Sequence, residues 1–357
     1  ESTGVLDTAW GSGIVTGSSG LTYAGEFVGA HFYVARLVQS PTEGISIFRL
    51  DVAGGKLIPA GQADAGQEPS FLAWDPAARF LFAVNETDPG RVRSFAIHQA
   101  SGVLTPVNDV PAMGSITAHL STDRTGRWLL VANYGDQKQG TIASFPIGAD
   151  GRLGMAVDTR EFGPGSMAHY ISTDPANRFV FVPLKGGPSV AQLEIDPATG
   201  RMKPNVPPYV AAAPGAGPRH LDFHPNGRFA YVINELDLTM TAYAYDAAHG
   251  RRRGLQVVSP LAAMAATAGA SAADVHVHRS GRFLYGSNRG HDSIVMYRLG
   301  DDGRMTLIGH ETRDIQRPRN FTIDPSGALM LVANQDGASV TLFRIDQRSG
   351  RLDRVGA

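Results

Sequence analysis

The sequence contains no cysteine in 357 residues. This excludes disulfide bonds, thiol nucleophiles and metal sites with cysteine ligands. Net charge is also nearly absent, because 32 basic residues balance 33 acidic ones and the two signs are intermixed along the chain. No basic stripe favours nucleic acid as a partner, and no apolar run reaches the length of a membrane-spanning helix.

Signatures of several enzyme classes are missing too. The sequence has no Gly-rich phosphate loop, no Gly-x-Ser-x-Gly elbow and no Ser-His-Asp signature. It also lacks a long amphipathic helical segment, and the nearest candidate, the Ala-rich run Leu261–Ala273, predicts a loop or a short helical turn. Glycine (42 residues) and proline (22) are abundant and evenly spread. Such spacing of turn formers indicates many short strands.

One pattern recurs along the chain. A turn such as Asp-Pro-x-x-Arg precedes an apolar strand, and a second, alternating strand and a closing Gly-x-Leu or Gly-x-Met follow. The apolar strands begin 46 to 54 residues apart, at His31, Phe80, Trp128, Phe179, Phe229, Phe283 and Leu329. Alternation with period two predicts antiparallel hairpins, and about fifty residues suit one four-stranded blade. The sequence therefore predicts an all-β fold, a single seven-bladed β-propeller over residues 31–357 after an irregular lead-in over residues 1–30.

Hairpin geometry predicts which side chains meet at one end of the blades. Arg219 lies as far before the turn at residues 226–227 as Glu235 lies after it, so both return to the same end. The same offset of 16 residues pairs Ser70 with Glu86, Ala118 with Tyr134, His169 with Lys185, Ala273 with Arg289 and Arg319 with Gln335. In a propeller these positions surround one mouth of the central channel, where a small ligand would bind. Three arginines and a lysine converge there, which favours an anionic small molecule.

Several segments resemble the lactonase family, which includes 6-phosphogluconolactonases and carboxymuconate cyclases. They are GPRHLDFHPNGRFAYVINEL (217–236), ASAADVHVHRSGRFLYGSNRGHDSI (270–294) and RPRNFTIDPSGALMLVANQ (317–335). The resemblance spans essentially everything after residue 30. It implies a seven-bladed propeller that acts on a lactone without a cofactor, in the cytoplasm. Residue 1 is Glu rather than Met, so a periplasmic or secreted location, with a removed signal peptide, also stays open.

The resemblance also implies site residues. The cyclases place a histidine, an arginine, a glutamate and a second arginine around the channel, and the matching residues are His169, Arg219, Glu235 and Arg289. We expect substrate contacts from Lys185, His220, Arg319, Gln335, Glu86 and Arg36. Two departures lie near the mouth: Ala35-Arg36-Leu37 stands for the usual Gly-Thr-Tyr, and Leu184-Lys185-Gly186 for the usual Asp-Leu-Gly. Both departures change the charge and hydroxyl pattern expected of the ligand.

Opening a lactone requires an activated water, a stabilised oxyanion and a proton for the leaving oxygen. We expect Glu235 or His169 to transfer the proton. Arg219 and Arg289 are expected to hold the substrate anion and the oxyanion. The structural alternatives are a salt bridge between Glu235 and Arg219, and a hydrogen bond from His169 to a neighbouring strand.

Other histidines and asparagines receive structural interpretations. His119, one position off the ring, is expected to pack between blades, and His220 to point to the face opposite Arg219 because side chains alternate. His276 and His278 have a spacing that can ligate metal, but they lie toward the turn end, and no metal site is predicted. Recurring asparagines are expected to cap backbone groups in loops: Asn85, Asn133, Asn234, Asn288 and Asn334.

Three functions remain open on this reading. The leading one is hydrolysis of a small, anionic sugar lactone at the channel mouth, without a cofactor or metal. The second is a cycloisomerase that closes a muconate to its lactone. The third is a non-catalytic binding propeller, because fold does not dictate function. The predicted partner is a small anionic lactone or carboxylate, with no nucleic acid and no membrane, and the sequence does not predict the oligomeric state.

Overall fold

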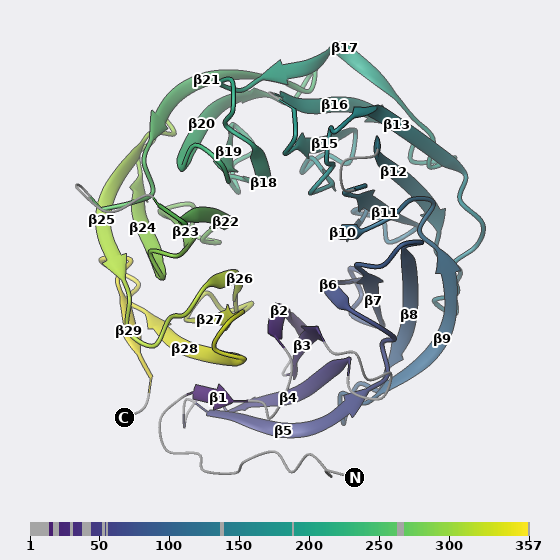
Figure 1. The fold of residues 1–357 in the computed structure, drawn as a ribbon, viewed down its shortest axis with the longest axis horizontal. Coiled ribbons are helices and arrows are strands. Elements are labelled where there is room, and N and C mark those ends of the chain that lie inside the picture. The colour runs from purple at the N-terminus through teal and green to yellow at the C-terminus, as the bar shows by residue number, and fades with distance from the viewer. Residues whose placement is uncertain are drawn as a thin grey trace.

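A computed structural model describes residues 14–16, 21–28, 31–37, 44–51, 54, 56–135, 139–187, 189–262 and 268–355. Over these residues the secondary structure consists of strands and turns, without a helix. The strands form seven sheets arranged in a circle around a common axis (Figure 1). The predicted all-β, seven-bladed propeller is therefore confirmed. The described part of the chain offers no helix with the length and apolarity of a membrane span.

Each blade is a meander whose first strand is innermost. Blade 1 contains β2 (Leu21–Val28), β3 (His31–Leu37), β4 (Ile45–Asp51) and β5 (Lys56–Ala63). Blade 2 contains β6 (Pro69–Trp74), β7 (Phe80–Asn85), β8 (Arg91–Ile97) and β9 (Leu104–Pro111). Blade 3 contains β10 (Thr117–Thr122), β11 (Trp128–Asn133), β12 (Gln139–Pro146) and β13 (Asp158–Pro164).

The remaining blades repeat this order. Blade 4 contains β14 (Ser172–Thr173), β15 (Phe179–Leu184), β16 (Ser189–Ile195) and β17 (Met202–Ala211). Blade 5 contains β18 (Pro218–Phe223), β19 (Phe229–Asn234), β20 (Thr239–Asp246) and β21 (Arg251–Val258). Blade 6 contains β22 (Ser271–Val277), β23 (Phe283–Arg289), β24 (Ser293–Leu299) and β25 (Met305–Glu311). Blade 7 contains β26 (Pro318–Ile323), β27 (Leu329–Asn334), β28 (Ser339–Ile345), β29 (Leu352–Arg354) and β1 (Ile14–Thr16).

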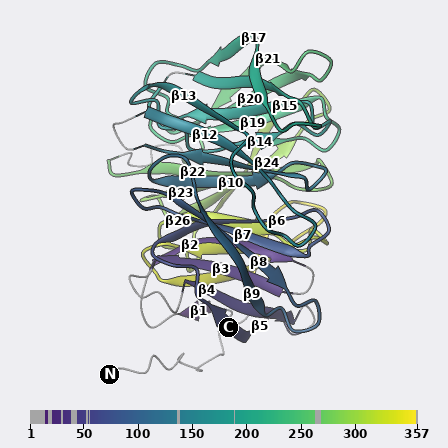
Figure 2. The same cartoon turned by 90° about the vertical axis from the view of Figure 1, so that its right-hand side faces the viewer.

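The seven apolar strands found in the sequence are the second strands of the seven blades, and each begins at the predicted residue. Strands such as β7 and β11 are buried at every position. Blades stack face to face, as the edge-on view shows (Figure 2), so a second strand is covered on both sides. This double burial explains why these segments read as continuous apolar runs rather than as alternating ones.

Hydrophobic packing runs around the circle rather than through its centre. Seven core clusters occur, and each joins side chains of two neighbouring blades. One of them packs Phe32 and Val34 of β3 against Leu329 and Leu331 of β27. This last contact closes the circle, because it joins the first blade to the seventh.

The first and the last described strands meet on blade 7. β1 pairs with β28 through Ile14–Thr16, and β29 pairs with the same strand through Leu352–Arg354. The blades therefore begin before residue 31, since β2 is the innermost strand of blade 1. The predicted lead-in over residues 1–30 is corrected for residues 14–16 and 21–28. The sequence hid β2 because the Gly-, Ser- and Thr-rich composition around it is typical of irregular segments.

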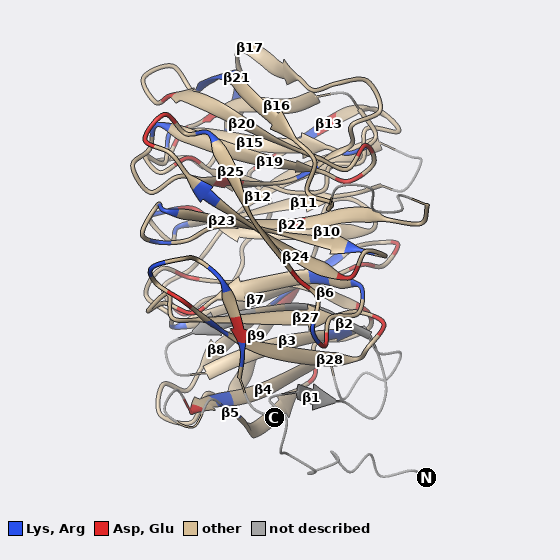
Figure 3. Ribbon diagram, turned by 90° about the vertical axis from the view of Figure 1, so that its left-hand side faces the viewer, with Lys and Arg blue, Asp and Glu red and all other residues tan. Residues whose placement is uncertain are grey.

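A second correction concerns the Ala-rich run Leu261–Ala273. Its last residues, 271–273, begin strand β22 rather than forming a loop or helical turn, and residues 263–267 lie outside the described part. Charged residues of both signs alternate around the loops and outer strands in the view of Figure 3, without gathering into one stripe.

Candidate functional site at the channel mouth

The innermost strands carry β-bulges that aim side chains at one mouth of the channel. Register shifts in blades 2, 3, 5 and 7 leave one extra residue each: Ser70, Ala118, Arg219 and Arg319. A bulged residue is unpaired and its side chain is redirected, which is common next to binding sites. The same four residues are ring positions that the 16-residue hairpin offset predicted. The bulges therefore give a physical reason why that offset finds residues that face the channel.

Glu235 binds three cations of the ring. Its Oε2 lies 2.8 Å from Nε of Arg219, and its Oε1 lies 2.8 Å from Nζ of Lys185 and 3.0 Å from an Nη of Arg289. Burial opposes ionisation of Glu235, but the three positive charges outweigh burial and lower its pKa to about 2. The carboxylate is therefore ionised at neutral pH and fixes the three cations in place.

Arg219 is the most deeply buried charged residue of the ring, with 2 % of its surface exposed. Besides Glu235, its Nη1 donates to the carbonyl oxygen of Ala273 at 2.6 Å and lies 3.2 Å from Nε2 of His220. Burial lowers the pKa of Arg219 to about 9 despite the nearby Glu235. The guanidinium is still protonated at neutral pH, and its orientation is fixed from two sides.

His169 precedes the short strand β14, where its backbone N–H donates to the carbonyl oxygen of Pro183 at 3.1 Å. Its ring packs edge-on against Tyr134, with centroids 5.7 Å apart. The Nδ1 atom is buried and has no hydrogen-bond partner. Burial, followed by the charges of Arg219 and other nearby cations, lowers the pKa of His169 well below the usual value. At neutral pH the imidazole is uncharged and can accept a proton.

One further hydrogen bond and one further ion pair complete the mouth. Nζ of Lys185 donates to the hydroxyl oxygen of Tyr134 at 3.2 Å, and Arg319 of blade 7 lies 3.5 Å from Glu86 of blade 2. The side chains of Lys185, Arg319 and Glu86 are 17, 14 and 23 % exposed, so they are more accessible than Glu235. Four cationic side chains thus face two carboxylates, and the mouth carries an excess of positive charge.

Arg36 and Gln335 were also predicted to contact the substrate. Arg36 is buried, and its Nη1 lies 3.5 Å from the hydroxyl of Ser46 on the adjacent strand. Gln335 follows β27, and its buried Oε1 has no hydrogen-bond partner. The roles of Arg36 and Gln335 as substrate contacts stay predictions.

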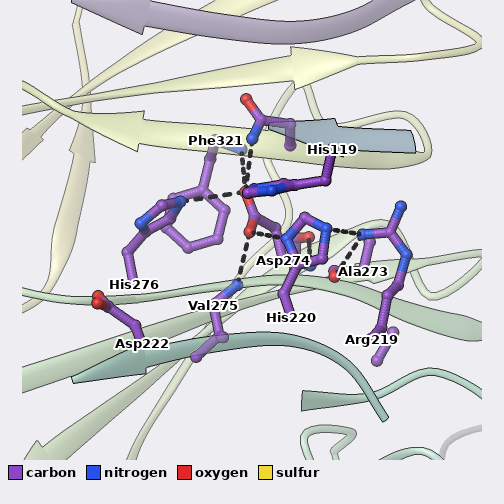
Figure 4. A network of polar contacts seen from close by, with 12 residues as sticks. His119, Arg219, His220, Asp222, Ala273, Asp274, Val275, His276 and Phe321 are labelled. Atoms are coloured by element: carbon purple, nitrogen blue, oxygen red, sulfur yellow. Dashed lines mark hydrogen bonds and ion pairs between the residues drawn. The ribbon is translucent and has the colours of Figure 1, made fainter. Parts of the chain in front are cut away.

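His220 does not turn away from the channel, which corrects the expectation from strand alternation. The bulge at Arg219 interrupts the alternation, and Arg219 and His220 line the same narrow gap. Arginine can only donate, so Nε2 of His220 accepts from Arg219, and Nδ1–H donates to Oδ1 of Asp274 at 2.7 Å (Figure 4). Burial and then Arg219 lower the pKa of His220 to about 4, which keeps this neutral tautomer at physiological pH.

Asp274 is the residue that sequence reasoning missed. Its carboxylate also accepts hydrogen bonds from Nε2 of His276 at 3.1 Å and from Nδ2 of Asn320 at 2.7 Å. Burial opposes its ionisation, but the two histidines lower the pKa of Asp274 well below the usual value. The network joins blades 5, 6 and 7 (Figure 4). The signal that could have revealed it is an acidic residue amid the alanines and valines of an innermost strand, ASAADVHV.

The remaining histidines and asparagines behave structurally. His119 packs between Phe71 and Tyr170 of the neighbouring blades, with ring centroids 4.2 and 4.1 Å away. His278 bonds to Ser280 and the carbonyl oxygen of Gly327, whereas His276 bonds to Asp274. The recurring asparagines use their amide groups to bond nearby loop carbonyls or hydroxyls: Asn85, Asn133, Asn234, Asn288 and Asn334. Within the described ranges no group of three His, Cys, Asp or Glu side chains could hold a metal ion.

Comparison with known proteins identifies the family. Residues 31–357 match the model of the family described as "Lactonase, 7-bladed beta-propeller". The chain belongs to this lactonase family. It is 35 % identical to a 6-phosphogluconolactonase of Pectobacterium carotovorum over 320 residues, which cover 88 % of this chain and 92 % of the relative. A 6-phosphogluconolactonase of Formosa agariphila is 30 % identical over 333 residues, covering 89 % of this chain and 92 % of the relative.

Two solved structures share this fold over more than nine-tenths of the chain. The periplasmic gluconolactonase PpgL of Pseudomonas aeruginosa superposes with a TM-score of 0.84 at 29 % identity, covering 91 % of this chain and 94 % of that chain. A putative 6-phosphogluconolactonase of Bacteroides fragilis gives a TM-score of 0.82 at 28 % identity, covering 92 and 95 %. This lactonase-family chain is thus similar to proteins named for two different lactones, one phosphorylated and one neutral.

Proposed function

We propose that the chain hydrolyses a small anionic sugar lactone at the channel mouth. The observation that carries this proposal is the convergence of four cations on two carboxylates beside a neutral imidazole. The excess positive charge suits a phosphate or carboxylate on the substrate, and arginine binds both through two parallel hydrogen bonds. Membership of the lactonase family, with relatives named 6-phosphogluconolactonase, supports the same activity.

Two candidate groups were expected to move the proton, and the geometry favours one of them. Three cations stabilise the anionic form of Glu235, so this carboxylate is a weak base and serves to fix Arg219, Arg289 and Lys185. His169 is neutral and offers an unpartnered Nδ1. In the proposed step His169 takes a proton from water while the water oxygen bonds to the lactone carbonyl carbon. The same proton then passes to the ring oxygen as the carbon–oxygen ester bond breaks.

The arginines stabilise the charge that this step creates. When water adds to the carbonyl carbon, the carbonyl oxygen becomes an oxyanion. Arg219 and Arg289 are held close together by Glu235, so their donors are oriented before the substrate arrives. Lys185 and Arg319 are the more exposed cations and would meet the anionic group of the substrate. An anionic substrate also offsets the cations that depress the pKa of His169, which makes it a better base in the complex.

The test is a comparison of three substrates with the purified protein. 6-Phosphogluconolactone and glucono-1,5-lactone test hydrolysis above the spontaneous rate, and a carboxymuconate tests lactone formation. We expect hydrolysis of the phosphorylated lactone, with losses of about 10²-fold in Glu235→Gln and His169→Asn. Lactone formation from carboxymuconate would replace the hydrolase with the cycloisomerase. Hydrolysis at an unchanged rate in both variants would overturn the assigned site, and no turnover of any substrate would favour a binding propeller.

A further inference from the structure

A second cavity lies along the channel on the other side of His220 from the mouth. Its volume is about 380 Å³, and it extends to the turn end of blades 2 and 3, at Pro76 and Arg124. Phe71 and His220 line both this cavity and the narrow gap beside Arg219. Their rings belong to a layer with His119 and Tyr170, in which neighbouring centroids lie 4.1 to 6.0 Å apart. This layer stands between the mouth and what we call the turn-end cavity.

The turn-end cavity has aromatic walls. Phe71, Trp74 and Tyr170 line it, from blades 2 and 4. All three are only half-buried although they stand on or next to innermost strands, so the surface that they expose faces the cavity. Aromatic faces carry partial negative charge and attract cations.

The charged wall of the cavity is acidic. Asp222, from β18, is half-buried and lines the cavity together with His276. Its two oxygens each accept one backbone hydrogen bond, from Val277 at 2.7 Å and from Phe223 at 2.8 Å, which leaves acceptor positions on both oxygens. Asp274 also lines the cavity. Figure 4 shows Asp222 and His276 on the side of Asp274 away from Arg219. Arg124 is the cation at the rim.

Two hydroxyl groups in the same wall have already used their hydrogens. Ser121 donates to the carbonyl oxygen of Ile171 at 2.8 Å, and Thr122 donates to that of Trp74 at 2.8 Å. What these hydroxyls offer to the cavity is lone pairs. A ligand that supplies donors and positive charge therefore matches this wall better than a neutral or anionic one.

We propose that the turn-end cavity binds a small organic cation, with its ammonium group between the faces of Trp74 and Tyr170 and with Asp222 as the counter-ion. A volume of about 380 Å³ is in the range of small-molecule sites. Burial raises the pKa of Asp222, and a bound cation would offset that cost of keeping the carboxylate ionised. The site is independent of the chemistry proposed at the mouth.

Choline is the probe, and 3,3-dimethylbutan-1-ol is its neutral isostere. Both are titrated at pH 8, where a histidine with an ordinary pKa of about 6.5 is uncharged, and binding is followed through the tryptophan emission. Trp74→Leu shows how much of the signal arises in the cavity. We expect choline to bind at least about tenfold more tightly than the isostere. Equal affinity of the two probes, or no binding of choline, would overturn the proposal.

Two variants separate this cavity from the mouth. Asp222→Asn keeps the size of the side chain and should weaken choline binding about tenfold, with thermal unfolding as the check that it folds. Glu235→Gln alters the mouth and should leave choline affinity unchanged. Loss of choline binding in Glu235→Gln with none in Asp222→Asn would place the cation at the mouth and refute the turn-end site. If the lactonase assay fails but choline binds as expected, the proposed function at the mouth is refuted and the cation site is not.

Discussion

The two ends of the central channel are built from the same innermost strands, yet they differ in charge. At the mouth, Arg219 and its neighbours surround Glu235 with an excess of cations. At the turn end, Asp222 and Asp274 stand among aromatic rings. A single strand, β18, supplies Arg219 to one end and Asp222 to the other. Arg219 is the bulged residue and Asp222 follows in the regularly paired part of the strand, so position along one strand decides which end a side chain serves.

The largest expected effect comes from removing the buried cation of the mouth. Arg219→Gln takes away a partner of Glu235 and a donor for the oxyanion, so kcat/KM for lactone hydrolysis should fall about 10³-fold. Arg304→Gln is the matched control, because Arg304 pairs with Asp302 and is 54 % exposed on an outer strand connection. Steady-state hydrolysis rates measure both. Equal rates in the two variants would show that the cations of the mouth are not the catalytic ones.

The next effect concerns Asp274, which lines the turn-end cavity and accepts a hydrogen bond from His220. Asp274→Asn removes a buried charge that accepts hydrogen bonds from His220, His276 and Asn320. We expect the free energy of unfolding to fall by about 3 kcal/mol, measured as a shift of the urea midpoint. Asp302→Asn is the control, because Asp302 is 63 % exposed. An unchanged midpoint in Asp274→Asn would show that the network does not join the blades energetically.

The proton-transfer group should be visible in the pH dependence. His169 has a lowered pKa because of burial and then the charge of Arg219. The acid limb of kcat/KM should therefore have an apparent pKa below about 6.5, the value of a free histidine. His169→Asn should lower kcat about 10²-fold and remove this limb. A limb at the ordinary pKa, unchanged in the variant, would assign the proton to another group.

Stability in acid should reflect the same buried imidazoles. His220 titrates near pH 4 in the folded chain and near pH 6.5 when unfolded. Between these values the unfolded chain binds more protons, so stability is lost as the pH falls, by at most about 1.4 kcal/mol per pH unit for this histidine. Thermal melting between pH 7.5 and 4.5 should show a smaller slope for His220→Gln. An unchanged slope in His220→Gln would show that this histidine does not contribute to the loss of stability in acid.

The smallest expected effect tests whether the two ends are separate. Asp222→Asn changes the turn-end cavity and should leave kcat/KM for lactone hydrolysis within about twofold of the original chain. The ring layer of Phe71, His119, Tyr170 and His220 lies between Asp222 and the mouth. A tenfold loss in the hydrolysis assay would mean that the two cavities act as one site.

Much of this architecture is readable from the sequence, because each blade repeats one local pattern. The apolar second strands are long enough and similar enough to be aligned by eye, and counting across the hairpin joins Arg219 to Glu235. The orientation of His220 was not predictable in this way, since a bulge breaks the period of two that such counting assumes. Asp274 was missed because its partners His220 and Asn320 come from other blades, so only the circular arrangement brings them together. Strand β1 is three residues long and pairs across the ends of the chain, which no local pattern reveals.

The central claim is that the mouth selects for negative charge on a lactone. The direct test is the ratio of kcat/KM for 6-phosphogluconolactone over that for glucono-1,5-lactone, two substrates that differ only by the phosphate. Lys185 and Arg319 should favour the phosphorylated substrate by at least about tenfold. Equal values, or a preference for the neutral lactone, would contradict the account.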